Sequence, residues 1–295
     1  MRATTVRAAW ASVAVATLLS AAKLYAAWLT GSVAVLGSLV DSGLDLVAAL
    51  ALLYGVHLAA EPADSDHRFG HGKAEALAAL FQVMLIGVSA LGIAIQAIRQ
   101  IASGAGSTAA PAGIAVSLLA IGVTLVLVLY QRRVIAASGS VAIATDTIHY
   151  RSDLALNLAV IAALVLDQYA DIHGADALFG LAIAAWLGWN AWSASAKAID
   201  QLMDREWPEA KRQQFLKVAA QHPELRGIHE LRTRTSGNRD FVQFHVWVDG
   251  QMSLAAAHRI MDEVEERLTR EFPDTEILIH PDPEGHQDPP SSDHK

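Results

Sequence analysis

The stretch Asp41-Ser42-Gly43-Leu44-Asp45 lies inside a run of residues that is otherwise apolar from Gly31 to His57. A run of this length predicts a membrane-spanning helix, in which a carboxylate is costly unless something compensates its charge. Because they are four residues apart, Asp41 and Asp45 share one face of the helix and are separated by about 6 Å along its axis. Two carboxylates on one face of such a helix therefore indicate a functional site.

A second apolar run, later in the chain, contains His149-Tyr150-Arg151-Ser152-Asp153 and repeats the spacing of four. If the two helices face each other, they offer a divalent cation three carboxylates and one imidazole, from Asp41, Asp45, His149 and Asp153. This ligand set suits zinc and its neighbours better than magnesium or calcium, which take more oxygen ligands.

Arg151 and Asp146, on the same predicted helix, leave a second interpretation open. They could neutralise the carboxylates in an ion-pair cluster that holds no metal. In the metal-site interpretation, the empty site carries several negative charges away from water, so we expect its carboxylates to retain one or more protons. Metal binding must displace these protons, because zinc binds deprotonated ligands. The ligand chemistry therefore predicts an exchange of protons for metal.

Six apolar runs are long enough to cross a bilayer, which takes about 20 residues per helix. We therefore expect an all-α transmembrane domain of six helices over residues 1–203. The predicted spans are Ala8–Leu29, Val33–Leu58, Ala74–Ile98, Pro111–Tyr130, Val141–Leu166 and Ala175–Ile199.

Basic residues occur in the loops on only one side of the predicted membrane. They precede the first and third spans and follow the fourth, whereas the connections after the first and fifth spans and the Ser103–Thr108 segment after the third contain no Lys or Arg; Arg99 ends the third span at the outer interface. The positive-inside rule therefore places both termini and the 60–73 loop in the cytoplasm. Lys23 lies near the outer end of the first span, where we expect its side chain to extend toward the membrane surface.

Composition separates a membrane part from a soluble part and excludes several classes of site. Residues 1–200 contain only 10 of the 22 Lys and Arg residues, so the remaining chain has the charge density of a soluble domain. The absence of cysteine excludes disulfides, thiolate zinc sites and cysteine nucleophiles. The net charge of -8 argues against nucleic-acid binding and suits a protein that attracts cations. The first apolar run is too long for a signal peptide.

Residues 204–284 predict a small α+β domain. Amphipathic helices are expected at Pro208–His222 and Leu254–Phe272, and strands at Ile228–Thr235, Phe241–Asp249 and Glu276–His280. The order αββαβ predicts an open sheet with both helices on one face. The polar, proline-containing tail, residues 285–295, is expected to be disordered.

Two further groups of residues have the chemistry of metal ligands. In the predicted cytoplasmic loop, Asp64, His67 and His71 are spaced to converge in a turn, although an ordinary solvated loop also explains them. In the soluble domain, scattered surface histidines are the alternative to a second metal cluster. The candidates there are His229, His245, His258, His280 and Asp282.

The chain resembles the cation diffusion facilitator family, in particular its bacterial zinc and iron efflux members. The resemblance covers nearly the whole chain. Its motifs are Asp41-Ser-Gly-Leu-Asp45, His149-Tyr-Arg-Ser-Asp153, Phe69-Gly-His71-Gly-Lys73-Ala-Glu75 and Leu231-Arg-Thr-Arg234. A site of two Asp residues, one His and a further Asp is similar to that of the zinc and cadmium carriers of the family.

The resemblance implies roles for each group of residues. Asp41, Asp45, His149 and Asp153 would form the transport site, and Asp64, His67 and His71 an interhelical loop site. Lys73 and Asp204 would form a charge interlock near the junction of membrane and cytoplasm. A binuclear zinc site in a metallochaperone-like cytoplasmic domain, bridged by Asp282, would use His229, His245, His258, His280 and Asp282.

The family implies a homodimer in the bacterial inner membrane. Such a protein would export Zn2+-like cations, including Cd2+ and Fe2+, by alternating access in exchange for protons, with Zn2+ also a structural or regulatory ion. Two other classes stay open. An intramembrane metallohydrolase would use the cluster to activate water, but no HExxH pair or placed general base is present. A metal-gated channel needs weaker sites than a four-ligand cluster. We therefore expect a transporter and not an enzyme.

Overall fold

The computed structural model describes the chain apart from residues 1, 31–32, 104–110, 171–174, 222–226 and 286–295. Within the helices, it leaves out the side chains of residues 2–3, 30, 33–38, 40–41, 111–117, 160, 163–170 and 175–176. The chain divides into two compact units, Met1–Asp200 and Gln201–Lys295.

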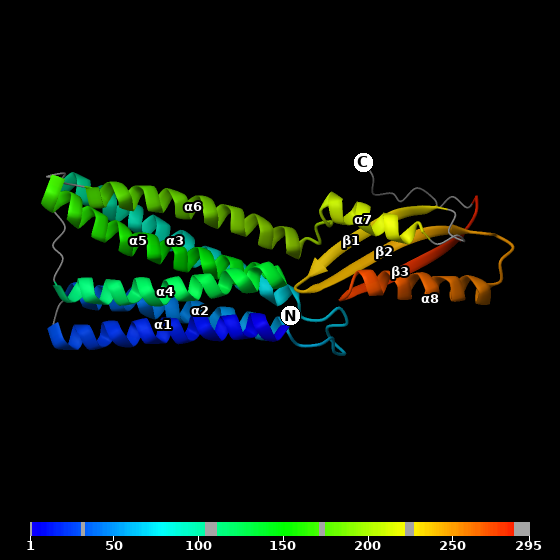
Figure 1. Ribbon diagram of the computed structural model, residues 1–295, viewed down its shortest axis with the longest axis horizontal. Helices are drawn as coiled ribbons and strands as arrows, with labels where there is room; N and C mark the ends of the chain where they lie inside the picture. The colour runs from blue at the N-terminus through cyan, green and yellow to red at the C-terminus, as the bar shows by residue number, and fades with distance from the viewer. Residues whose placement is uncertain (1, 31–32, 104–110, 171–174, 222–226, 286–295) are drawn as a thin grey trace. The chain divides into compact units, whose positions relative to one another are not determined.

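Over the described residues, the regular secondary structure of the first unit is all helical (Figure 1). Its helices are α1 (Arg2–Thr30), α2 (Val33–Ala59), α3 (Lys73–Ser103), α4 (Pro111–Ser138), α5 (Val141–Ala170) and α6 (Ala175–Leu202). Each predicted span lies within one of these helices, so the predicted helical architecture is confirmed. Pro111 stands at the first position of α4, where its missing N–H costs no helical hydrogen bond.

Five of the helices contain a described stretch that is long and apolar enough to cross a membrane: α1, α2, α3, α4 and α6. Helix α5 is not among them over its described residues, which are mainly those of its first half and include the charged residues Asp146, Arg151 and Asp153. Its 30 residues give it a length of about 45 Å, which is sufficient to span a bilayer. The sixth crossing stays a prediction.

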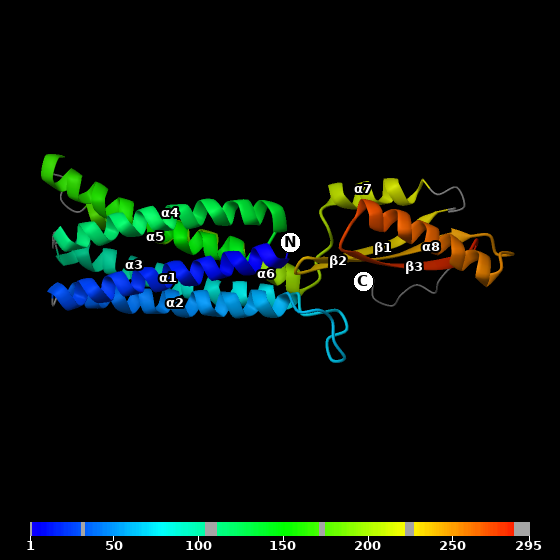
Figure 2. The same cartoon turned by 60° about the horizontal axis from the view of Figure 1, so that its bottom comes forward.

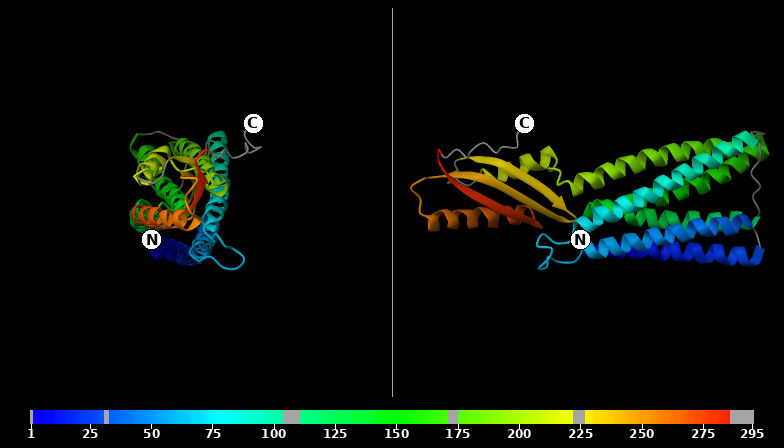
Figure 3. Two further views of the ribbon diagram at one scale, coloured as in Figure 1. Left: turned by 90° about the vertical axis from the view of Figure 1, so that its right-hand side faces the viewer. Right: turned by 180° about the vertical axis from the view of Figure 1, so that it is seen from behind.

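The six helices run roughly along one direction (Figure 3). Helix α1 packs against α2 and α4, and α5 packs against α4, α3 and α2. Helix α3 packs against α6 through the buried residues Ile86, Ala90, Leu187 and Ala191. At Gly55 of α2 the backbone approaches α3 so closely that a Cβ atom there would overlap the side chain of Ala78. The packing therefore brings α2 and α5, which carry the two motifs, next to each other.

The turn between α4 and α5 shows why α5 begins where it does. Gly139 ends α4 in a left-handed conformation with φ 66°, which glycine adopts without steric cost. Ser140 then caps α5, because its Oγ accepts a hydrogen bond from the backbone N–H of Ile143 at 3.2 Å. The same hydroxyl donates to the buried carboxylate of Glu75 in the first turn of α3. This contact fixes the start of α5 against the start of α3.

The second unit contains two helices and a three-stranded sheet over its described residues. Its elements are α7 (Glu209–Ala219), β1 (Ile228–Ser236), β2 (Arg239–Val248), α8 (Leu254–Glu271) and β3 (Thr275–Pro283). The strand order is β1-β2-β3, with β1 and β2 antiparallel and β2 and β3 parallel. The predicted αββαβ order is confirmed. The hairpin is tighter than predicted, because Ser236 pairs with Arg239 and Gly237, with φ 62°, allows a two-residue turn.

Both helices pack on the same face of the sheet, as Figure 2 shows. Phe244 of β2 is fully buried, and its ring lies 5.6 Å from that of Phe215 of α7. From α8, Ile260, Val264 and Leu268 complete this core. Alternation along β2 places Phe244, Val246 and Val248 in the core, so His245 and Trp247 face the other way.

Phe244→Ala should lower the free energy of unfolding of a fragment of residues 201–295 by about 3–5 kcal/mol, because it removes the ring at the centre of the core. Urea unfolding followed by circular dichroism measures this change. Leu278→Ala is the matched control, since Leu278 is 61% exposed on the neighbouring strand. Equal destabilisation by both substitutions would contradict the assignment of the core.

Candidate metal sites

The structure brings Asp45 of α2 together with His149 and Asp153 of α5. The His149 Nε2 atom lies 3.0 Å from Oδ1 of Asp45 and 3.6 Å from Oδ2 of Asp153. One ligand atom from each residue lies within 4.8 Å of the others. The side chain of Asp41 lies outside the described residues, so its place in the predicted group of four stays a prediction.

These separations suit a zinc-sized ion. A tetrahedral ion with bonds of about 2.0–2.2 Å holds its ligand atoms about 3.3–3.6 Å apart. The distances of 3.0 Å and 3.6 Å around His149 bracket that range. The side chains are sheltered but reachable, with exposed fractions of 13% for His149, 26% for Asp45 and 31% for Asp153. The cluster can therefore bind a divalent cation after a small adjustment of its side chains.

The buried carboxylate of Asp146, one turn before His149, is compensated by neutral donors. Its Oδ2 atom accepts hydrogen bonds from Ser12 of α1 and Gln131 of α4, each at 2.6 Å. Its Oδ1 atom accepts from the side-chain amide of Gln82 of α3. The interactions described for Asp146 are thus hydrogen bonds across four helices. They do not support the alternative in which Asp146 and Arg151 neutralise the carboxylates of the transport motif.

Lys23 differs from its prediction. Its Nζ atom turns to the neighbouring helix α2, where it donates a hydrogen bond of 2.6 Å to Oγ of Ser42. Ser42 is 2% exposed and lies in the motif between Asp41 and Asp45. The contact between Lys23 and Ser42 could not be predicted from the sequence, because a Lys near a helix end carries no signal of which helix its side chain faces.

The loop between α2 and α3 brings Asp64, His67 and His71 together. His67 Nδ1 lies 3.4 Å from Oδ1 of Asp64, and His71 Nε2 lies 3.5 Å from Oδ2. The backbone N–H groups of His67 and Asp66 donate to Oδ1 of Asp64 at 2.6 and 2.9 Å. These hydrogen bonds, that of His67 first, hold the pKa of Asp64 below its usual value although burial opposes them. The loop therefore keeps a carboxylate anion beside two imidazoles.

The soluble unit places three histidines in one row across its sheet. His245 of β2 pairs in register with His229 of β1 and with His280 of β3, and Asp282 lies two residues beyond His280 on the same face. An irregularity in β1 between His229 and Arg232, where Glu230 has φ 48°, sets the strand's register at this point. All three imidazoles reach the face of the sheet that α7 and α8 leave uncovered.

Asp282 is the centre of this cluster. Its Oδ2 atom lies 2.9 Å from Nδ1 of His245 and 3.3 Å from Nε2 of His229, and its Oδ1 atom lies 3.3 Å from Nε2 of His280. Burial favours the neutral carboxyl, but the hydrogen bond from His245 and the neighbouring imidazoles outweigh it and lower the pKa of Asp282. One ligand atom each from His229, His245 and Asp282 lies within 4.8 Å of the others, and two nitrogens with a carboxylate oxygen are a ligand set that zinc binds.

His258 lies apart from this group within the chain. It is on α8, is 75% exposed, and its Nδ1 atom lies 3.3 Å from Oδ1 of Asp262 one turn later. The residues that the structure places in one cluster with Asp282 are therefore His229, His245 and His280. The role predicted for His258 stays a prediction.

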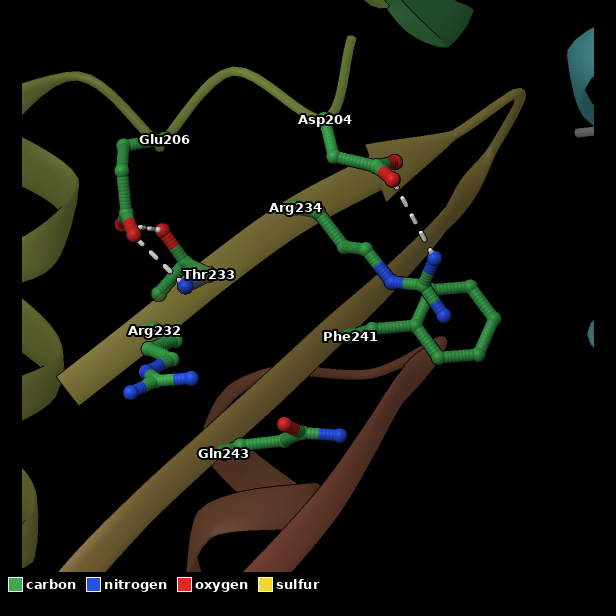
Figure 4. A pocket seen from close by; sticks show the side chains of 7 residues that line it. All are labelled: Asp204, Glu206, Arg232, Thr233, Arg234, Phe241 and Gln243. Carbon is green, nitrogen blue, oxygen red and sulfur yellow. Dashed lines mark hydrogen bonds and ion pairs between the residues drawn. The ribbon is translucent and has the colours of Figure 1, made fainter. Parts of the chain in front are cut away.

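Asp204 borders a pocket beside β1 and β2 (Figure 4). One of its carboxylate oxygens lies 3.5 Å from Nη1 of Arg234, whose guanidinium stacks over the ring of Phe241 at 4.7 Å. Its predicted partner Lys73 begins α3 in the other unit. The interlock between the two stays a prediction.

Two family models cover nearly all of the chain. The cation efflux transmembrane domain matches residues 9–203, and the cytoplasmic domain of cation efflux proteins matches residues 207–284. The chain belongs to the cation diffusion facilitator family. Cation diffusion facilitators are transporters and not enzymes, so membership excludes the metallohydrolase alternative.

Known relatives within the family are similar over almost their whole length. The cation-efflux pump FieF of Cronobacter sakazakii is 42% identical over 277 residues, which cover 94% of this chain and 92% of the relative. The pump of the same name from Escherichia coli O127:H6 is 41% identical over the same length. Among solved structures, the zinc form of CzrB is 31% identical and matches 29% of this chain and 99% of its own, with a TM-score of 0.27.

Asp146→Leu should destabilise the membrane unit by roughly 2–4 kcal/mol, because it leaves the buried amides of Gln82 and Gln131 without an acceptor. The measurement is the apparent melting temperature of the full chain in detergent. Asn190→Leu serves as the control, since Asn190 is only partly buried and its side chain donates to a carbonyl of its own helix. An unchanged melting temperature for Asp146→Leu would contradict the described network.

Proposed function

We propose that this cation-efflux protein exports Zn2+-like divalent cations, with Zn2+ and Cd2+ foremost and Fe2+ as a further substrate, in exchange for protons. The observation that supports the proposal is the convergence of Asp45, His149 and Asp153 within a bundle of apolar helices. Ligands of this kind at membrane depth mark ion pathways, because uncompensated charges there are costly. Asp41, one helical turn before Asp45, is proposed as the fourth ligand.

Proton coupling follows from the ligands themselves. The ligand atoms of two carboxylates and one imidazole lie within 4.8 Å of one another, so like-charge repulsion between the carboxylates favours protonation of the empty site. A zinc ion displaces these protons when it binds, and their return favours its release. Alternating access of the site to the two sides of the membrane would then couple the two flows.

The proposed orientation places both termini in the cytoplasm of a bacterium, with the chain in the inner membrane. The helix ends that carry Arg7, Lys73, Arg132 and Arg133 lie at one end of the bundle together with the 60–72 loop (Figure 1). The positive-inside rule assigns this end to the cytoplasm. The relatives named as cation-efflux pumps come from bacteria, which supports the same location. We propose that the working form is a homodimer.

The other two clusters are proposed as zinc sites with a structural or regulatory role. In the cytoplasmic domain, zinc would be held by His229, His245 and Asp282, with His280 reaching the other oxygen of Asp282. A bound ion there would link side chains from the three strands, so its binding free energy would add to the stability of the fold. Such a site would respond to cytoplasmic zinc, while the loop site of Asp64, His67 and His71 would lie at the entrance to α3.

Zinc flux into proteoliposomes tests the function. Wild-type protein should show saturable zinc flux into the vesicles. This flux should increase when the pH gradient drives protons out of them, because protons must leave the site as zinc enters it. Asp153→Ala should reduce this flux to the level of empty liposomes, since it removes one of the ligands. A zinc-sensitive dye inside the vesicles gives the initial rates.

The controls separate a transporter from a channel. Asp262→Ala alters an exposed carboxylate of α8 and should leave the flux unchanged. Flux that is insensitive to the pH gradient would overturn proton coupling. Flux that also does not saturate would favour the channel alternative, and undiminished flux in Asp153→Ala would remove the proposed transport site.

His245→Ala should abolish the rise in melting temperature that zinc gives to the 201–295 fragment, because His245 is central in the row of ligands. A saturating ligand at a hundred times its Kd stabilises a fold by about 2.7 kcal/mol. His258→Ala should retain most of this stabilisation in the fragment, since His258 lies apart from the cluster. Loss of the effect in both variants would show that His258 is a ligand, and persistence in both would refute the site.

A further inference from the structure

Lys23 places a cation beside the proposed transport site. Its side chain is half-buried within the bundle, and its Nζ atom donates at 2.6 Å to Oγ of Ser42, a residue of the Asp41–Asp45 motif. A second contact from α1 meets the same residue, because Ser20 Oγ donates to the carbonyl of Ser42 at 3.1 Å. Two hydrogen bonds from α1 thus converge on the turn of α2 that carries the ligands.

The ammonium group also acts on the opposite side of the site. Its charge is among those that act on the carboxylate of Asp153 on α5. The other groups described at the site are the carboxylate of Asp45 and the imidazole of His149. The nearby carboxylate of Asp146 is already held by Ser12, Gln82 and Gln131. Lys23 therefore supplies a fixed positive charge to a site made mainly of acids.

This charge has opposite effects on the empty and the loaded site. An ammonium group has no lone pair and cannot bind a metal, so Lys23 cannot serve as a ligand. It attracts the carboxylates when they are empty and repels a dication that they hold, and both effects weaken metal binding. These effects are strong at membrane depth, where water screens charges poorly. Efflux requires the site to release its ion as well as to bind it. A site with lower affinity for the metal can therefore support a higher rate of transport.

We propose that Lys23 is a tethered counter-cation of the transport site, which lowers the affinity for the metal ion and speeds its release. Its flexible four-carbon stem allows the ammonium to remain on Ser42 or to approach the vacated carboxylates. The inference rests on the proposed transport site of Asp45, His149 and Asp153. It adds a residue that determines how tightly that site holds its ion.

Transport kinetics in proteoliposomes test the role of Lys23, with the full chain and zinc as the substrate. Lys23→Gln removes the charge and keeps a donor for Ser42. We expect the KM for zinc to fall by about ten-fold, since one repelling charge in a weakly screened site is lost, and the maximal rate to fall with it. If Lys23 had only a structural role, the substitution would instead lower the maximal rate without lowering the KM.

Two further variants make the result specific. Lys23→Arg keeps the charge and should retain a KM near that of the wild type. Ser42→Ala removes the acceptor but not the cation, so its KM should stay above that of Lys23→Gln. If Lys23→Gln is not recovered folded, as judged by size-exclusion chromatography and melting temperature, Lys23→Met replaces it.

An unchanged or raised KM in the folded neutral variant would overturn the proposal, as would an equally low KM in Lys23→Arg. Failure of the transport site itself is distinguished by Asp153→Ala measured in parallel. If that variant transports zinc like the wild type, the ligands have been misassigned and the inference falls with them. If Asp153→Ala is inactive while Lys23→Gln keeps a wild-type KM, the site stands and the role of Lys23 alone is refuted.

Discussion

Charges inside a membrane must be compensated, and the described contacts of the buried acids in the helical unit follow from this constraint. Asp146 is held by hydrogen bonds from three other helices, and the buried Glu75 accepts from the residue that caps α5. Among the described side chains, Asp45 and Asp153 both contact the imidazole of His149, and both remain partly exposed. The carboxylates that accept hydrogen bonds from several helices hold those helices together. The carboxylates that contact only one neighbouring side chain among those described can still bind an ion. The cost of an uncompensated charge in a membrane therefore explains both groups: the structural acids are compensated by hydrogen bonds, and the proposed functional acids would be compensated by a metal ion.

The cytoplasmic unit assembles its ligands by strand pairing. His229, His245 and His280 come from three strands and meet because their positions are in register across the sheet. Helices α7 and α8 cover the opposite face, so alternation along β2 places Phe244 in the core and His245 outside. A shift of one residue in the register of either strand pair would point a histidine of this row toward the core. The fold of this unit thus provides both a stable core and a row of ligands from adjacent positions.

Much of the architecture was predictable because apolar runs and strand alternation are local signals. The six helical segments, the αββαβ order and the pairing of Asp45 with His149 and Asp153 all follow from spacing along the chain. Lys23 was predicted wrongly, since a lysine near a helix end can turn toward the surface or toward a neighbouring helix. Asp146 was considered only as a partner of Arg151, because its three actual donors lie 15, 64 and 134 residues away. His258 could not be separated from the other histidines until α8 was placed.

By itself, the sequence determined which residues have the chemistry of metal ligands and which segments are apolar enough to form long helices, because ligand chemistry and hydropathy are properties of single residues and short runs. The tertiary structure decided which acidic side chains accept hydrogen bonds from neighbouring helices and which can bind an ion. It also decided that Lys23 contacts Ser42 of α2 and that three histidines form one row. These facts depend on distances between helices and on the register between strands. Both are set by the packing of the whole chain, and no short stretch of sequence encodes them.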